Sequence, residues 1–362
     1  MSEGARSLWH MHAIVPPYLL ARLAATDEPH LARAAQAARA TLAVPRTYDP
    51  VRAVIDVTVE GYALVFEASP VPDRVISDAQ NREELPGVLV RAEDDPPTGD
   101  AAADEAFDGL GYTHRFFWEA FERSSLDGAG APLRATVHYG VDYDNAFWDG
   151  QQMVFGDGDG EVFTGFTRSV TVIAHELGHG VVEHAGGLEY QGQSGALNES
   201  IADVFGALTE QQRLGHTADQ ADWLIGAGIF TEVVTGTALR SMSAPGTAYD
   251  DDVLGKDPQP GHMRDYVVTT GDNGGVHINS GIPNKAFHLV ATTLGGYAWE
   301  RAGRIWYGAL TGGTLSRTAS FTDFAAATTA TAEQEYGEDS EEAAAVRDAW
   351  IGVGVTEDAP IA

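Results

Sequence analysis

The pattern of apolar and polar positions changes character near the middle of the chain. In the first half, residues 19–42 and 101–123 have the spacing of amphipathic helices, whereas residues 51–67 alternate in the manner of strands. Shorter strands are predicted at 136–143 and 152–155, between turns rich in Gly, Asp and Asn. The first half is therefore predicted to mix helices with strands.

After residue 169 the strand pattern fades and helical spacing dominates. A proline-rich, acidic stretch at 71–100 is predicted to form loops that join an N-terminal segment to the main body. We therefore expect an α+β fold in three regions, with uncertain first boundary, at 1–75, 76–185 and 186–362. The helices predicted in the second half lie at 169–184, 196–214, 281–294, 295–310, 321–336 and 340–352.

Composition narrows the classes of partner and of metal site. The chain has 362 residues, with 22 Lys and Arg against 53 Asp and Glu, which gives a formal net charge of −31. This acidity repels phosphate backbones and anionic membranes, so we expect neither nucleic acid nor a membrane as a partner. Cysteine is absent, so any metal must be held by His, Asp or Glu. No apolar run approaches the roughly 20 residues of a membrane-spanning helix, and residues 1–18 lack the apolar core of a signal peptide.

The sequence His175-Glu176-Leu177-Gly178-His179 matches the pattern H-E-x-x-H and follows an apolar run. Histidines four positions apart lie on one helix face, so both imidazoles can reach one ion. Glu176 then lies beside the metal, where it can take a proton from the attacking water and pass it to a leaving amine. The alternative is a pair of helix histidines that bond to backbone or solvent.

A catalytic zinc site needs a third protein ligand. The sixth residue after His179 is Ala185, which excludes the metzincin arrangement, and His184 is expected at the surface. Glu199 on the next predicted helix is the stronger candidate, and Asp203 on the same face can orient a ligating imidazole. The alternative is a solvated acidic pair, although like charges at this spacing cost free energy unless a cation lies between them.

Five sequence blocks, in order, resemble the thermolysin-like metalloproteases. The resemblance implies a two-lobed zincin with a β-rich N-terminal lobe, a mainly helical C-terminal lobe and the active-site helix between them. It also implies one Zn²⁺ and hydrolysis of peptide bonds. Members of the family are largely secreted, so secretion is expected, with a cytoplasmic location left open. The blocks are 145–160, 175–179, 195–199, 240–242 and 272–281.

The resemblance also implies a role for individual residues near the metal. Without it, His277 in its Gly-rich segment would be read as a turn residue. An imidazole backed by a carboxylate is nevertheless suited to stabilise charge that develops on a carbonyl oxygen. The implied zinc ligands are His175, His179 and Glu199; the implied general base is Glu176; and the implied oxyanion group is His277 with Tyr190, supported by Asp272.

A second set of residues matches the substrate-binding groups of the family. Asn145, the carbonyl of Ala146 and Arg240 match groups that hold the substrate backbone. The matched walls of the primed-side pocket are apolar, which implies cleavage on the amino side of large hydrophobic residues. Taken alone, these wall residues would be ordinary core. They are Phe163, Phe166, Val172 and Leu239.

The N-terminal sequence Pro16-Pro17-Tyr18-Leu19-Leu20 resembles the short propeptide of the protealysin-like branch. This implies a precursor that processes itself and whose own N-terminal segment inhibits the cleft. A rigid Pro-Pro followed by apolar side chains suits an apolar cleft, while the alternative is an ordinary helix start.

The paired calcium site of the family is degraded in this sequence. Three of the five matching positions have no carboxylate, and calcium prefers 6 to 8 oxygen ligands. We therefore doubt that a tight double site is retained, and whether any calcium binds is left open. The matching positions are Thr171, Glu210, Asp222, Leu224 and Ala227.

These observations predict a monomeric zinc-dependent neutral endopeptidase that acts on polypeptides. One alternative is a zinc-binding scaffold without turnover, against which the presence of Glu176 argues. Another is a zinc hydrolase of small amides or esters, against which the matches at Asn145 and Arg240 argue.

Overall fold

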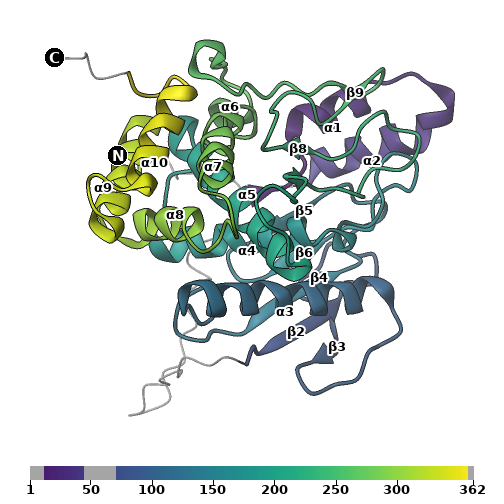
Figure 1. Ribbon diagram of the computed structural model, residues 1–362. Coiled ribbons are helices and arrows are strands. Elements are labelled where there is room, and N and C mark those ends of the chain that lie inside the picture. The colour runs from purple at the N-terminus through teal and green to yellow at the C-terminus, as the bar shows by residue number, and fades with distance from the viewer. Residues whose placement is uncertain (1–11, 45–70, 358–362) are drawn as a thin grey trace, which may run out of the picture.

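The computed structural model describes residues 12–44 and 71–357 (Figure 1). The strands predicted at 51–67 lie outside these residues. A six-stranded sheet has the order β1-β5-β6-β4-β2-β3, with parallel pairing of β2 with β4 and of β4 with β6. Its strands are β1 (His12–Ala13), β2 (Arg74–Asp78), β3 (Val88–Ala92), β4 (Leu133–Val137), β5 (Ala146–Trp148) and β6 (Met153–Phe155).

Helix α3 (Ala101–Phe121) lies against this sheet, as predicted for 101–123 (Figure 1). It begins after Asp100, whose side chain accepts a hydrogen bond from the backbone N–H of Ala103 and so caps the helix. Its buried face includes Phe107, Leu110 and Phe117. The burial of this face against the strands forms the core of the β-rich lobe.

Helices α4 (Val170–Ala185) and α5 (Gly192–Leu214) cross at the centre of the molecule. Glycines let them approach closely. A Cβ at Gly178 would lie 3.0 Å from the Cα of Ala202, and one at Gly206 would lie 2.7 Å from the carbonyl oxygen of Thr171. Because no side chain separates the helices at these points, the inward faces of α4 and α5 meet directly.

The C-terminal lobe is mainly helical. Helices α7–α10 gather on one side of α5, whereas α1 and α2 lie on the other (Figure 1). Trp306, Phe324 and Trp350 pack against one another in the core of this lobe. Its helices are α6 (Asp272–Asn279), α7 (Gly281–Leu294), α8 (Ala302–Thr311), α9 (Phe321–Tyr336) and α10 (Glu341–Gly352), and two small two-stranded sheets pair β7 (Leu224–Ile225) with β8 (Arg240–Ser241) and β9 (Asp250–Asp251) with β10 (Gly255–Lys256).

The N-terminal segment packs onto this body through two helices, α1 (Pro17–Ala24) and α2 (Ala32–Ala43), which are joined by a short 3-10 turn, η1 (Pro29–Leu31). Leu19, Leu20 and Leu23 of α1 are fully buried. Among the described residues, no helix is long and apolar enough to cross a membrane.

Three sequence predictions of secondary structure were wrong. The stretch 71–100 contains β2 and β3, because pairing with β4 stabilises strands that local composition does not favour. The helical run 19–42 breaks before Pro29, where proline cannot continue a helix. The helix predicted at 295–310 begins only at Ala302, since Gly295 and Gly296 adopt left-handed φ values of 64° and 68°.

Candidate active site

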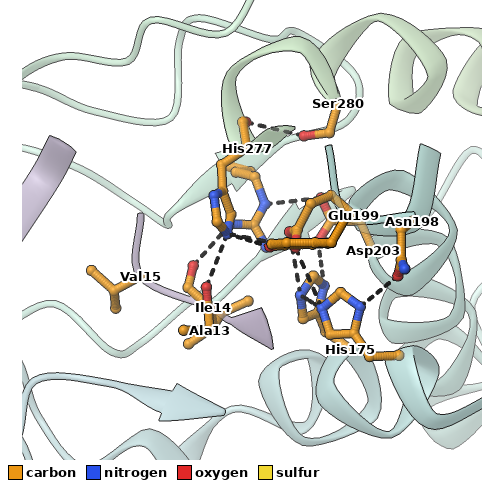
Figure 2. A network of polar contacts seen from close by, with 12 residues as sticks. Ala13, Ile14, Val15, His175, Asn198, Glu199, Asp203, His277 and Ser280 are labelled. Atoms are coloured by element: carbon orange, nitrogen blue, oxygen red, sulfur yellow. Dashed lines mark hydrogen bonds and ion pairs between the residues drawn. The ribbon is translucent and has the colours of Figure 1, made fainter. Parts of the chain in front are cut away.

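The three predicted zinc ligands meet where α4 crosses α5. His175 and His179 project from α4 and Glu199 projects from α5, and all three are buried. Figure 2 shows His175 next to Glu199. The Nε2 atoms of the two histidines lie 3.0 Å apart. The Glu199 carboxylate oxygens lie 3.6 Å from His175 Nε2 and 3.5 Å from His179 Nε2. The solvated acidic pair is therefore excluded for Glu199, which water does not reach.

The chemistry of this donor set fits zinc. Two imidazole nitrogens face each other, and Glu199 Oε2 is buried with no hydrogen-bond partner among the described residues. A buried carboxylate in that state is costly unless a cation neutralises it. Tetrahedral zinc with bonds of about 2.0–2.1 Å requires ligand atoms roughly 3.3 Å apart, which is close to the separations found here.

Each histidine ligand is oriented through its other ring nitrogen. Asp203 Oδ1 lies 2.8 Å from His175 Nδ1, and Asn198 Oδ1 lies 2.8 Å from His179 Nδ1. Such contacts fix the tautomer that presents Nε2 to a metal. Sequence reasoning identified Asp203 but missed Asn198, for which the one available signal was its place directly before Glu199.

Asp203 is also bound to the C-terminal lobe. Arg240 donates two hydrogen bonds of 2.8 Å to its carboxylate, and Asn284 Nδ2 donates another of 2.8 Å. Burial alone would raise the pKa of Asp203, but the Arg240 charge and the hydrogen bond with His175 hold it below its usual range. Asp203 is therefore ionised, and it links a ligand on α4 to a cation on β8.

Glu176 lies on α4 beside the ligands and is fully buried. Burial, and then the charge of Glu199, raises the pKa of Glu176 well above its ordinary value. A cation held by Glu199 would remove much of this repulsion. The Glu176 carboxylate therefore lies close enough to Glu199 to be affected by its charge, and its part as a general base stays a prediction.

Tyr190, His277 and Asp272 form a chain next to Glu199. Figure 2 shows His277 beside Glu199. The Tyr190 hydroxyl donates to Glu199 Oε1 and lies 3.2 Å from His277 Nε2. Asp272 Oδ1 lies 2.5 Å from His277 Nδ1. Burial would lower the pKa of His277, but the charges of Asp272 and Glu199 raise it, so the imidazolium is favoured. His277 lies in the last turn of α6, just after three residues with left-handed φ values, so the Gly-rich segment is a turn that leads into the helical turn carrying the imidazole.

The residues predicted to hold a substrate backbone hold the chain's own N-terminal segment. Asn145 Oδ1 accepts from the backbone N–H of Val15 at 2.9 Å, and Asn145 Nδ2 donates to the carbonyl of Val15 at 3.1 Å. The N–H of Ile14 donates to the carbonyl of Ala146 at 3.1 Å. Arg240 donates to the carbonyl of Ile14 at 3.1 Å. These are the contacts of an extended peptide.

The predicted pocket walls are buried and belong to the same apolar cluster as Ile14. They come from four separate places in the chain, namely the loop before α4, the η3 turn (Phe166–Arg168), α4 itself and the segment before β8. The ring centroids of Phe163 and Phe166 lie 5.7 Å apart. Phe163, Phe166, Val172 and Leu239 therefore all belong to the main apolar core of the protein.

The motif Pro16–Leu20 lies next to these contacts and does not supply them. Residues 13–15 make the hydrogen bonds to the site, whereas Pro17 begins α1, as the helix-start reading predicts. Tyr18 is nevertheless placed near Tyr249, Asp257 and Arg240, and burial raises its pKa well above the ordinary value. The motif therefore anchors the extended segment on its C-terminal side.

Comparisons with known proteins decide the family. Residues 60–183 match the family model described as the catalytic domain of thermolysin metallopeptidase, and residues 186–355 match the model of its alpha-helical domain. The chain belongs to the thermolysin metallopeptidase family. As a member, it is a zinc-dependent neutral endopeptidase made as a precursor.

The relatives of this chain include proteins of similar length and longer proteins. An extracellular metalloprotease of Pectobacterium carotovorum is 51% identical over 95% of this chain and 96% of its own length. A thermolysin of Alicyclobacillus acidocaldarius is 40% identical over 77% of this chain but only 50% of its own length. The solved precursor of protealysin, a metalloproteinase from Serratia proteamaculans, covers 95% of this chain and 100% of its own, with 50% identity and a TM-score of 0.85.

The positions that match the calcium site of the family lie at the other end of the α4–α5 pair, which we call the calcium-like end. Their side-chain oxygens form hydrogen bonds and ion pairs within the protein. Thr171 Oγ1 accepts from the N–H of Gly226 at 2.9 Å, and Glu210 pairs with Arg213 at 2.6 and 2.8 Å. Asp222 accepts from the N–H of Leu224 at 3.0 Å. Thr171, Glu210 and Asp222 thus each have at least one side-chain oxygen bonded within the protein.

Sequence reasoning also missed a histidine of the N-terminal segment. The His12 ring stacks on that of His179, with centroids 4.2 Å apart, and contacts Tyr190 edge-on at 4.1 Å. Burial, and then the neighbouring His175 and His277, lowers the pKa of His12 to about 3. No periodicity or motif pointed to it, because its position follows from the pairing of β1 with β5.

Proposed function

We propose that this metallopeptidase hydrolyses peptide bonds on the amino side of large hydrophobic residues. The observation that carries the proposal is the way residues 14 and 15 are held beside the metal cluster. Asn145, Ala146 and Arg240 bond to every backbone N–H and carbonyl of Ile14 and Val15. A site that reads the backbone of two successive residues suits an extended polypeptide better than a small amide or ester.

The residues around the proposed zinc site have different roles in this reaction. His175, His179 and Glu199 would hold the zinc, which, when bound, supplies a Lewis acid that polarises the scissile carbonyl and acidifies water. Glu176 takes the proton of the attacking water and passes it to the leaving amine. No covalent intermediate with the protein is required.

The oxyanion is stabilised from the opposite side of the cleft. His277 Nε2 and the Tyr190 hydroxyl lie 3.2 Å apart, so both can donate to one oxygen atom once the Tyr190 hydroxyl turns away from Glu199 Oε1. Asp272 fixes the His277 ring and keeps its charge, because a carboxylate at Nδ1 favours the imidazolium. Asp203 orients His175 in the same manner.

The preference for a large apolar residue follows from the apolar cluster around Ile14. The residue whose N–H bonds to Ala146 is Ile14, which is buried in the same apolar core as Phe163, Phe166, Val172 and Leu239. We infer that these four residues contact the substrate side chain at this position. Burying a large apolar side chain there contributes about 1.5–3 kcal/mol. Peptides with Gly or Asp at this position should therefore be cleaved far more slowly.

We also propose that residues 1–75 act as the inhibitory propeptide of the lobes at 76–185 and 186–362, and that the chain removes them itself. The support is that residues 13–15 occupy the groups that would hold a substrate. An incoming peptide cannot bond to Asn145 and Arg240 until this segment has left.

Further proposals concern metals, assembly and location. We propose one zinc and no tight double calcium site, since Thr171 and Glu210 already have protein partners. We propose a monomer without nucleic-acid or membrane partners, in keeping with the charge of −31. We propose secretion, because the relatives in Pectobacterium and Serratia marcescens are extracellular proteases by name.

The test compares the purified full-length chain with its Glu176→Ala variant. Dye-labelled casein should be cleaved by the wild type only, while both retain zinc and the variant stays at full length. Sequencing of peptide fragments should place new N-termini at large hydrophobic residues. Equal turnover in both chains, or rapid cleavage of small esters with none of casein, would contradict the proposal.

A further inference from the structure

His12 lies inside the zinc cluster, and none of the roles described above uses it. One ligand atom from each of His12, His179 and Glu199 lies within 4.8 Å of the other two. Two of these residues, His179 and Glu199, are also proposed zinc ligands, and their atoms lie 3.5 Å apart. His12 is therefore close enough to share an ion with two of the three proposed ligands.

The His12 ring packs on His179 and Tyr190, but one of its nitrogens lacks a hydrogen bond. Its Nδ1 is buried and forms no hydrogen bond with the described residues. Leaving such a nitrogen unpaired inside a protein costs free energy. A metal ion accepts the lone pair of a neutral imidazole and removes that cost.

The backbone holds His12 at this place. His12 pairs with Trp148 and Ala13 with Phe147 in the antiparallel β1–β5 ladder. The Ala13 carbonyl lies 3.0 Å from His277 Nε2, next to the cluster (Figure 2). Ile14 and Val15 are also hydrogen-bonded to the site, so the backbone on the C-terminal side of His12 is fixed and keeps its side chain next to His179 and Glu199.

We propose that His12 is a fourth protein ligand of the zinc in the precursor, filling the position that a catalytic zinc site leaves open. Zinc with four protein ligands is the closed arrangement of structural sites, whereas catalytic sites keep three. The N-terminal segment thus inhibits by ligation as well as by filling the cleft. This inference rests on the proposed function, since it takes His175, His179 and Glu199 as the other ligands.

Ligation by His12 also explains how a substrate-like segment can remain whole. The Ala13–Ile14 bond has its carbonyl at His277 and its N–H at Ala146, as a bond to be cleaved would. Hydrolysis requires a water oxygen to bond to the Ala13 carbonyl carbon while the C–N bond breaks and the Ile14 nitrogen gains a proton. His12 excludes the water that would make this attack.

The decisive experiment counts imidazole ligands by X-ray absorption at the zinc edge. The full-length chain carries Glu176→Gln, so that it does not hydrolyse itself. We expect three imidazoles in this chain and two when His12→Ala is added. The control is His30→Ala, an exposed histidine of the same segment, which should leave three. Two imidazoles with and without His12 would overturn the inference.

Zinc retention gives a second readout that does not depend on activity. Against a competing chelator, the His12→Ala chain should release zinc about tenfold faster or more. His12→Cys should restore retention, because a thiolate is also a zinc ligand. If His12→Cys released zinc as fast as His12→Ala while both kept the thermal transition of the parent chain, ligation would be disproved.

With Glu176 intact, the His12→Ala chain should accumulate a form that begins at Ile14, visible by mass spectrometry. A chain that matures elsewhere yet keeps the Ala13–Ile14 bond would contradict shielding by His12. Different results would contradict the proposed zinc site and the proposed role of His12. Absence of zinc from every form defeats the proposed site, whereas zinc with two imidazoles in an active protease defeats only the part assigned to His12.

Discussion

The two ends of the α4–α5 pair differ in whether their buried polar side chains have partners within the protein. At the zinc end, Glu199 is buried and one of its oxygens has no protein partner. At the calcium-like end, Glu210 is paired with Arg213 and Thr171 is bonded to the Gly226 N–H. An unpartnered buried carboxylate indicates a missing cation, whereas a partnered one does not. The zinc end of the helix pair therefore offers an unpaired carboxylate oxygen to a cation, whereas Glu210 and Thr171 at the other end already bond to groups of the protein.

The largest effect is expected at the zinc end, from Glu176→Gln. The amide cannot accept the proton of water, so kcat on a peptide substrate should fall by about 10²–10⁴-fold. Zinc content should stay at one per chain, because Glu176 is not a ligand. Loss of zinc from this variant, measured by atomic absorption, would move Glu176 from proton transfer to metal binding.

Asp203→Asn should affect stability and metal together. The variant leaves Arg240 buried without its counter-ion, which costs about 3–5 kcal/mol. Loss of the carboxylate behind His175 should weaken zinc binding by about 10–100-fold. Denaturant unfolding measures the loss of stability, and competition with a chelator measures the loss of zinc affinity. Glu210→Gln at the other end is the matched control and should change the unfolding free energy by less than about 1 kcal/mol.

Gly206→Ala tests the close crossing that connects the two ends. The added Cβ would lie 2.7 Å from the Thr171 carbonyl oxygen, so the helices must separate, at a cost of about 1–3 kcal/mol. The melting temperature should fall and the zinc affinity with it. Gly165→Ala is the control, since the nearest atom to its Cβ is 3.8 Å away. Equal melting temperatures for the two variants would contradict a tight crossing.

A smaller effect on stability is expected from a substitution of His138. This histidine forms ion pairs with Asp100 and Asp157, so it resembles the calcium-like end, where polar side chains find their partners within the protein. The hydrogen bond to Asp157 raises its pKa to about 9 against the opposing effect of burial, and Asp100 adds to the rise. A raised folded-state pKa stabilises the protein fully below the unfolded value of about 6.5, and the gain is lost as pH rises through 9. His138→Gln should therefore lower stability by about 1 kcal/mol at pH 6 and by nothing at pH 10. A pH-independent difference in thermal denaturation would show that packing, and not charge, is responsible.

The smallest effect should come from calcium. Adding millimolar calcium to the zinc-loaded chain should leave its melting temperature unchanged, because an ion stabilises only the folded state that binds it. Addition of zinc to a stripped chain should raise the melting temperature by several degrees in the same instrument. A calcium-dependent rise of similar size would show that the calcium-like end retains a functional site.

Local spacing in the sequence was sufficient for much of this arrangement. The four-residue interval of His175 and His179 puts both on one helix face, and the same interval relates Glu199 to Asp203. The boundaries of α7 and α9 followed from helical periodicity alone. Periodicity works here because each of these helices buries one continuous face.

Only the tertiary structure decided which distant residues meet. Arg240 bonds to Asp203 and to the carbonyl of Ile14, residues 37 and 226 positions away. Asn198 reaches His179, and His12 reaches the cluster, because helix crossing and strand pairing bring them together. The sequence by itself determined the metal-binding faces, since these depend on local helix geometry. The tertiary fold determined the partners of those faces, since contacts between separate elements leave no fixed spacing in the chain.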